Sequence, residues 1–274
     1  MAKERILIAV KTYPTLSKKY IELVCTAGFR EDGSWVRIYP SPFRFLGDDQ
    51  KYKKYQWIDI ELEKNPRDSR PESYRPINID DITLGEVIST GHRRDWYERK
   101  RFILGNNRIY TNLQEVIDGA KNDAFSLAIF KPTEILQVTS EKVSDSWGAS
   151  REEAAKESLK QGSLFADTAT ASEKVMPKLP YKFSYRFRDD HGKVSKLMIE
   201  DWEIGQLYWG CFKKGGEEYA VQKVKEKYWD DFAKTKDLHL FLGTTYKFHK
   251  MSAPNPYVII GTFHPPYDDQ LSLL

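Results

Sequence analysis

Short apolar runs and alternating apolar and polar positions predict a chain that is rich in short strands. Residues 6–10 form a continuous apolar run, which is typical of a strand buried on both faces. Residues 35–39 alternate strictly, so Val36 and Ile38 would face a core and leave three aromatic or basic side chains opposite. Residues 56–63 alternate in the same way and would present an acidic outer face. Further strands are predicted at residues 22–27, 124–130, 134–139, 194–199, 238–242 and 257–263.

The second half of the chain combines strands with helices. Residues 181–188 show the clearest alternation, with aromatic residues on one face and mostly cations on the other. Helical patterns cover residues 200–212 and 217–234, and Gly215 and Gly216 separate them. A further short helix is predicted at residues 112–121. The predicted fold class is therefore α+β, with an N-terminal small β-barrel domain, a linker, and a C-terminal α+β domain that has a hairpin and two helices.

Composition marks out the linker. Residues 146–178 contain few β-branched or aromatic residues and many small or charged ones, so they cannot bury much apolar surface. We therefore expect a flexible linker there, with a turn or two of helix at residues 151–160. The predicted division is a β-rich domain at 1–145, the linker at 146–178, an α+β domain at 179–264 and a tail at 265–274.

Charge and cysteine content narrow the function classes. The 43 basic residues face 40 acidic ones, so any nucleic-acid surface must arise from local segregation of charge. Cys25 and Cys211 are the only cysteines, which excludes a disulfide framework and a cysteine-based zinc site and favours a reducing compartment. The first residues lack a signal-peptide cleavage site, and no apolar run approaches the length that spans a membrane. We expect a soluble, cytoplasmic protein without a membrane partner.

Basic and aromatic residues are interleaved in several segments, as single-stranded nucleic acid requires. The outer face of residues 35–39 has this character, unless a second layer of structure covers it. Residues 91–101 are the most concentrated basic segment, and the alternative is that they form a solvated surface. The candidate nucleic-acid contacts are Lys11, Lys18, Lys19, Trp35, Arg37, Tyr39, Arg44, Arg93, Arg94, Trp96, Arg99, Lys100, Arg101, Lys182, Arg186 and Arg188.

Candidate catalytic residues are few. The acids near residue 200 could hold Mg²⁺ beside a scissile phosphate, although Asp201 and Glu203 would diverge if both lay within a helix. The alternative is that they form a hydrated helix start, where acids complement the helix dipole. The candidates are Asp190, His191, Glu200, Asp201 and Glu203. We predict no metal site and no cofactor, with Mg²⁺ required only if the protein is a nuclease.

Two resemblances bear on function. Residues 23–28 (LVCTAG) and 35–40 (WVRIYP) resemble the start of bacterial dual OB-domain proteins, which implies an OB-like barrel and nucleic-acid binding for the first part of the chain. The pentads QGSLF at 161–165 and QLSLL at 270–274 resemble the motif by which bacterial polymerases and repair proteins bind the sliding clamp. The resemblance implies polar anchors at Gln161 and Gln270, and apolar pocket contacts. The implied clamp-binding residues are Gln161, Ser163, Leu164, Phe165, Gln270, Leu271, Ser272, Leu273 and Leu274.

These observations lead to one hypothesis and two alternatives. The leading hypothesis is a non-enzymatic protein that binds single-stranded DNA or RNA, is tethered to the bacterial sliding clamp, and acts in replication, repair or phage defence. The first alternative is a metal-dependent nuclease or another enzyme that processes nucleic acid. The second is an adaptor between proteins that has no contact with nucleic acid.

Overall fold

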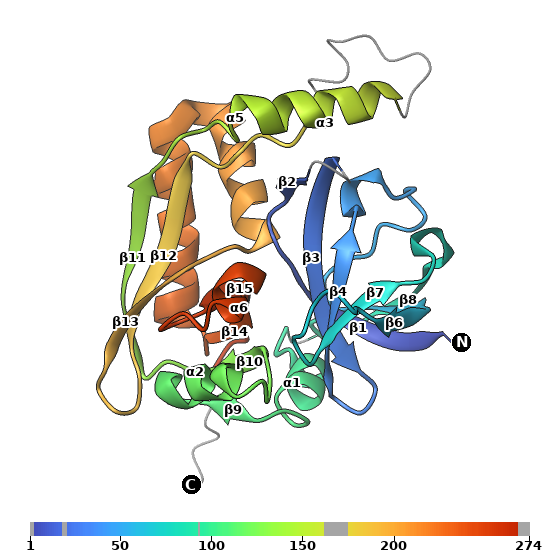
Figure 1. Ribbon diagram of the computed structural model, residues 1–274. Helices are drawn as coiled ribbons and strands as arrows, with labels where there is room; N and C mark the ends of the chain where they lie inside the picture. Colours follow the sequence, from blue (N-terminus) through green and yellow to red (C-terminus); the bar gives the residue numbers. More distant parts are fainter. Residues whose placement is uncertain (1–2, 18–20, 93, 162–174, 268–274) are drawn as a thin grey trace, which may run out of the picture.

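A computed structural model describes residues 3–17, 21–92, 94–161 and 175–267 of the chain (Figure 1). Strands dominate the first part, and strands and helices alternate in the second. The predicted α+β class is confirmed. Among the described residues, no helix is both long enough and apolar enough to cross a bilayer.

The N-terminal part is one strongly curled sheet, a half-barrel whose strands run in the order β6-β7-β4-β3-β1-β5-β8, with β2 paired to β3 (Figure 1). Irregular register in β1 between Ile8 and Val10, and in β3 between Val24 and Thr26, is the kind of bulge that bends a sheet. The strands are β1 (Glu4–Lys11), β2 (Thr15–Ser17), β3 (Ile21–Arg30), β4 (Trp35–Ser41), β5 (Gln56–Ile60), β6 (Leu62–Lys64), β7 (Ser73–Pro76) and β8 (Thr83–Val87). Two 3₁₀ turns, η1 (Phe43–Phe45) and η2 (Ile79–Asp81), lie in its loops.

The C-terminal part contains two smaller sheets and most of the helices. One sheet has the order β15-β14-β10-β9 and the other β11-β12-β13. The strands are β9 (Ile109–Tyr110), β10 (Leu127–Phe130), β11 (Glu134–Lys142), β12 (Tyr181–Arg188), β13 (Val194–Met198), β14 (His239–Thr244) and β15 (Tyr257–Phe263). The helices are α1 (Tyr97–Ile103), α2 (Leu113–Lys121), α3 (Ala149–Gln161), α5 (Trp202–Lys225), the π-helical η3 (Glu226–Ala233) and α6 (Tyr246–Lys250).

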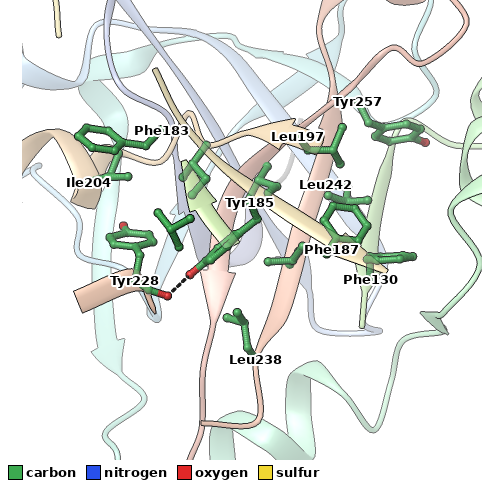
Figure 2. Close-up of a cluster of buried hydrophobic side chains, with 14 of the residues drawn as sticks. Phe130, Phe183, Tyr185, Phe187, Leu197, Ile204, Tyr228, Leu238, Leu242 and Tyr257 are labelled. Atoms are coloured by element: carbon green, nitrogen blue, oxygen red, sulfur yellow. Dashed lines mark hydrogen bonds between the residues drawn. The ribbon is translucent and has the colours of Figure 1, made fainter. Parts of the chain in front are cut away.

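The aromatic face of β12 forms the centre of the C-terminal core (Figure 2). Phe183, Tyr185 and Phe187 are fully buried, as the alternation of residues 181–188 predicts. The hydroxyl of Tyr185 donates a hydrogen bond of 2.6 Å to the main-chain oxygen of Tyr228, in η3. This bond joins the sheet to the helical layer at a point that water does not reach.

Replacing Tyr185 by Phe should lower the free energy of unfolding by about 1 kcal/mol, because the buried hydrogen bond is lost while the packed ring remains. Urea unfolding measures the loss. Tyr181→Phe is the matched control, since the hydroxyl of Tyr181 bonds to Glu217 on the outside of the protein. We expect the control to lose distinctly less. Equal losses of unfolding free energy in the two variants would contradict the claim that burial strengthens the contribution of the Tyr185 hydrogen bond.

The two parts of the chain pack against each other through both apolar and polar contacts. Phe29 and Trp35 of the half-barrel contact Phe241 of β14, with ring centroids 6.2 and 5.6 Å from its own. The main-chain nitrogen of Tyr13 donates to the oxygen of Glu200 at 2.8 Å. Helix α3 extends from the α5 side of the molecule toward β2 and β3 (Figure 1).

Some predicted elements differ in detail. Residues 56–63 were expected to form one strand, but the structure divides them into β5 and β6 at Glu61. The predicted break at the glycine pair corresponds to Gly216, whose φ of 78° lies outside the helical region, so α5 is kinked there. The short elements β2, β7, β8, β9 and α6 carry too little periodicity to be predicted.

Candidate functional site

A cavity of about 620 Å³ lies between the half-barrel and the C-terminal part. Its walls come from the segment between β1 and β2, from β2, β3 and β4, from the segment around β7, and from the β14–α6 and β15 segments. Four arginines line it against two acids, Asp68 and Glu200. Burial raises the pKa of Glu200 above its usual value. We call this space the arginine-lined cavity. Its arginines are Arg37, Arg67, Arg70 and Arg75.

Arg70 is a buried residue held in a fixed position. Its Nε and Nη2 atoms donate to the two oxygens of Asp68 at 2.8 and 2.6 Å, and Nη1 donates to the main-chain oxygen of Thr244 at 2.6 Å. Burial alone would raise the pKa of Asp68, but hydrogen bonds from Arg70 and Ser73 lower it to about 2. The pair therefore stays ionised and links the loop before β7 to the end of β14.

Arg37 is 1% exposed, so its guanidinium cannot reach a strand on the protein surface. The interpretation of residues 35–39 as an open binding face is therefore wrong for Arg37, because a second layer covers it. Its Nη1 and Nη2 atoms donate to the hydroxyl and main-chain oxygens of Ser126 at 2.9 and 3.3 Å. Ser126 in turn donates to Glu72. Burial lowers the pKa of Arg37. Because the ordinary pKa of arginine is so high, the side chain remains charged.

Exposed residues line the cavity at Arg67 and at the start of α6. Arg67 is exposed, and its guanidinium has no hydrogen-bond partner in the part of the chain that the structure describes. Tyr246 begins α6, lines the cavity and is still 43% exposed, with its ring centroid 5.7 Å from the guanidinium carbon of Arg70. Phe248, on the same helix, is 46% exposed, and Lys247 and Lys250 are exposed beside it.

Helix α6 is not among the predicted elements, although its sequence contains a usable signal. Residues 246–250 read YKFHK, the same interleaving of aromatic and basic residues that was noted at residues 35–39. In this helix His249 faces inward, where its Nε2 atom lies 2.9 Å from Asp123 Oδ1, and the other side chains are exposed.

A cluster of charges lies at the junction of the two parts, with the side chain of Asp201 buried and that of Glu203 46% exposed. Lys54 Nζ is 2.8 Å from Glu203 Oε2, 3.9 Å from Asp201 Oδ2 and 3.0 Å from the main-chain oxygen of Thr262. The expectation that Asp201 and Glu203 diverge is wrong, because Asp201 is the extended N-cap of α5 and not a residue inside the helix. Both carboxyls approach one lysine. The side chain of Lys54 is only 12% exposed.

The remaining acid candidates lie apart from this cluster. Asp190 and His191 form the turn between β12 and β13, and the length of β13 separates them from Glu200. Glu200 lines the arginine-lined cavity, whereas Glu203 lines a second cavity of about 430 Å³. Within residues 3–17, 21–92, 94–161 and 175–267, no group of three His, Cys, Asp or Glu side chains is arranged to hold a metal ion.

The predicted nucleic-acid contacts do not form one surface. Trp96 and Arg99 line the second cavity, and Trp35 packs in the core. Lys11 lies under the rings of Phe43 and Trp202. Tyr39 lines the arginine-lined cavity. Arg44 forms an ion pair with Glu22, and Arg101 forms one with Glu98. Lys100 lies within α1, and Arg94 lies in the segment before that helix. Lys182, Arg186 and Arg188 lie on β12, on the side of the molecule opposite β6 to β8 (Figure 1).

Several predictions concern residues that the structure does not describe. Lys18, Lys19 and Arg93 lie outside the described residues. Residues 162–165 and 270–274 of the two pentads also lie outside the described residues. Gln161, the first residue of the first pentad, is the last residue of α3.

Comparisons with known proteins give two family matches. A family model described as a domain of unknown function (DUF8758) matches residues 2–105, and another, described as a domain of unknown function (DUF8757), matches residues 110–274. No curated protein matches the chain. A solved structure described as a murine DNA-binding protein bound with double-stranded DNA aligns over 97% of this chain and 95% of that one, with 10% identity and a TM-score of 0.31. A score this low carries no argument about fold or function.

Proposed function

We propose that this chain, which belongs to the family described as a domain of unknown function (DUF8757), binds single-stranded nucleic acid along α6 and the rim of the arginine-lined cavity. The observation that carries the proposal is the composition of α6. Tyr246 and Phe248 are exposed there, and the exposed Lys247 and Lys250 lie beside them. Rings on which bases stack, next to cations that contact phosphates, are the two elements that proteins use to bind single strands.

The surroundings of α6 reinforce its charge. Arg67 and Arg75 are exposed around the same cavity, and Arg75 is partly neutralised by Glu63 at 2.7 Å. The net charge of the whole chain is only +3. Attraction for a phosphate backbone must therefore come from local groups of cations such as these.

Binding to a labelled single-stranded oligonucleotide of about 20 nucleotides, followed by fluorescence anisotropy, tests the proposal. Affinity should fall steeply between about 50 and 200 mM salt, because the bound cations displace counterions. Replacing Tyr246 and Phe248 together by Ala should weaken binding by about tenfold or more, since each stacked base is worth about 1–3 kcal/mol.

The matched control replaces Lys182 and Arg186 by Ala. Both are exposed cations on β12, away from α6, and we expect them to leave the affinity nearly unchanged. If this variant loses binding and the α6 variant keeps it, the interface is the β12 face and the proposal for α6 is wrong. If wild-type protein binds no strand at any salt concentration, the adaptor alternative replaces it. Degradation of the oligonucleotide on adding Mg²⁺ would instead favour the nuclease alternative.

We also propose that the two pentads tether the protein to the bacterial sliding clamp, so that it reaches nucleic acid during replication, repair or phage defence. The support is the repeated pattern Gln-x-Ser-Leu followed by Phe or Leu, at residues 161–165 and 270–274. The first pentad begins at the last residue of α3. Two weak motifs on one chain could engage two pockets of a ring and gain affinity through effective concentration.

A further inference from the structure

We infer that the arginine-lined cavity receives one unstacked nucleotide, with the base between the two parts of the protein and the phosphate at the rim. The inference rests on the proposed binding of a strand by α6, because Tyr246 belongs to both places. It adds a site for a nucleoside monophosphate unit, which either a strand or a free nucleotide could supply.

The size and walls of the cavity suit a base. Its volume of about 620 Å³ falls within the range of about 300–1,000 Å³ that is usual for small-ligand sites. Leu23, Val258 and Ile260 supply an apolar wall, and Tyr39 and Tyr246 supply rings. Aromatic side chains and apolar walls are what single bases use when they leave a stack and enter a protein.

The deep arginines retain hydrogen-bonding capacity. A guanidinium has five N–H groups, and the hydrogen bonds of Arg70 to Asp68 and Thr244 use three of them. Toward the residues that the structure describes, Arg37 uses two, both to Ser126. Their remaining donors can serve acceptors such as the carbonyl oxygens and ring nitrogens of a base. Since Asp68 and Glu72 already balance much of this charge, the site would suit a polar base better than a free phosphate at this depth.

The rim provides the phosphate contact. Arg67 lines the cavity but is exposed, and no hydrogen bond to another side chain in the described ranges restrains its guanidinium. A planar, freely available guanidinium binds phosphate oxygens in a bidentate manner. A base inside the cavity with its phosphate at Arg67 leaves the next nucleotides free to continue toward Phe248. A base paired in a duplex would first have to be extruded, so a single strand or a free nucleotide is the less costly source.

Cys25 allows a direct test, because it lines the cavity and is half-buried while its neighbours Val24 and Thr26 are fully buried. The experiment measures the rate at which a maleimide alkylates Cys25 in a Cys211→Ser variant, which removes the other thiol of the chain. The ligands are each of the four deoxynucleoside monophosphates and a single-stranded oligonucleotide. At a ligand concentration about ten times its Kd, alkylation should slow about tenfold, in proportion to the free fraction of the cavity.

A second measurement does not depend on the reactivity of the thiol. Cys25→Trp places a large side chain in the cavity and leaves α6 intact. An oligonucleotide carrying one 2-aminopurine should gain fluorescence on binding to wild-type protein, because that base unstacks from its neighbours. With Cys25→Trp the oligonucleotide should still bind, but the gain should be lost. Thermal unfolding checks that this variant is folded.

The outcomes separate this inference from the proposed function. If the oligonucleotide binds but neither protects Cys25 nor shows a fluorescence gain that Cys25→Trp removes, the inference is wrong and the function of α6 stands. If free nucleotides protect Cys25 and the oligonucleotide does not bind, the cavity is a site for a free nucleotide and the proposed function fails. Failure of every ligand to bind or protect overturns both.

Discussion

Replacing Lys54 by Met should lower the free energy of unfolding by about 3 kcal/mol at about pH 8, because it removes the nearest cation from the buried carboxylate of Asp201. Lys54 Nζ contacts Glu203 at 2.8 Å and lies 3.9 Å from Asp201, whose side chain is 2% exposed. Burial alone would lower the pKa of Lys54, but Glu203 and Asp201 raise it, so the lysine remains charged. Its loss leaves the buried Asp201 carboxylate without its nearest cation, although Lys11 still interacts with it electrostatically.

The size of this effect should depend on pH. Burial and the neighbouring Glu203 raise the pKa of Asp201 from 3.8 to about 7. The folded state therefore holds a proton at Asp201 that the unfolded chain has lost, so this carboxyl contributes stability that grows as the pH falls from about 7 to 4. Burial lowers the pKa of His264 to about 3, so the contribution of His264 runs the opposite way over the same range. Burial would raise the pKa of Glu203 as well, but Lys54 lowers it below its usual value. We expect Lys54→Met to be less destabilising at about pH 5.5 than at pH 8.

Denaturant unfolding across pH, with three further variants, tests this account. Lys53→Met is the matched control, because Lys53 is exposed and should tolerate the change. Asp201→Asn keeps an oxygen that accepts from Glu203 N at the helix start, and it should remove the part of the pH profile that Asp201 contributes between about 4 and 7. Adding it to Lys54→Met should recover much of the lost stability at pH 8. A loss that is the same at both pH values would show that Asp201 does not carry the effect.

Removing both pentads should lower affinity for a bacterial sliding clamp by about a hundredfold or more, because two motifs on one ring gain strongly from effective concentration. The variant combines Leu164→Ala and Phe165→Ala with deletion of residues 270–274. Either change alone should retain part of the affinity. Binding of purified protein to immobilised clamp measures all three.

The control for the clamp experiment is Asp167→Ala with Thr168→Ala, which alters residues shortly after the first pentad and keeps its pattern. We expect this variant to bind like the wild type. If the wild type does not bind the clamp, the resemblance of the pentads is coincidental. Binding of single strands at α6 would be unaffected by that result, since none of its residues belongs to a pentad.

The candidate site was only partly predictable, and Arg37 and α6 show why. The alternation of residues 35–39 correctly places Val36 and Ile38 in the core of the half-barrel. It does not reveal that Ser126 and Glu72, far along the chain, enclose the opposite side of β4. In α6 the aromatic and basic residues are visible in the sequence, but five residues are too few to show a helical period.

The sequence by itself determined the α+β class and the inward face of β12, because alternation between neighbouring residues is a local property of a strand. It also contains both pentads, whose interpretation depends on residue identity alone. Only the tertiary structure decided that Arg37 is buried, that Asp201 and Glu203 share Lys54, and that Arg67, Arg70 and Tyr246 border one cavity. The physical reason is that the pattern of apolar and polar residues along an element shows which positions share a face. The element that covers that face comes from elsewhere in the chain, so the local pattern does not identify it.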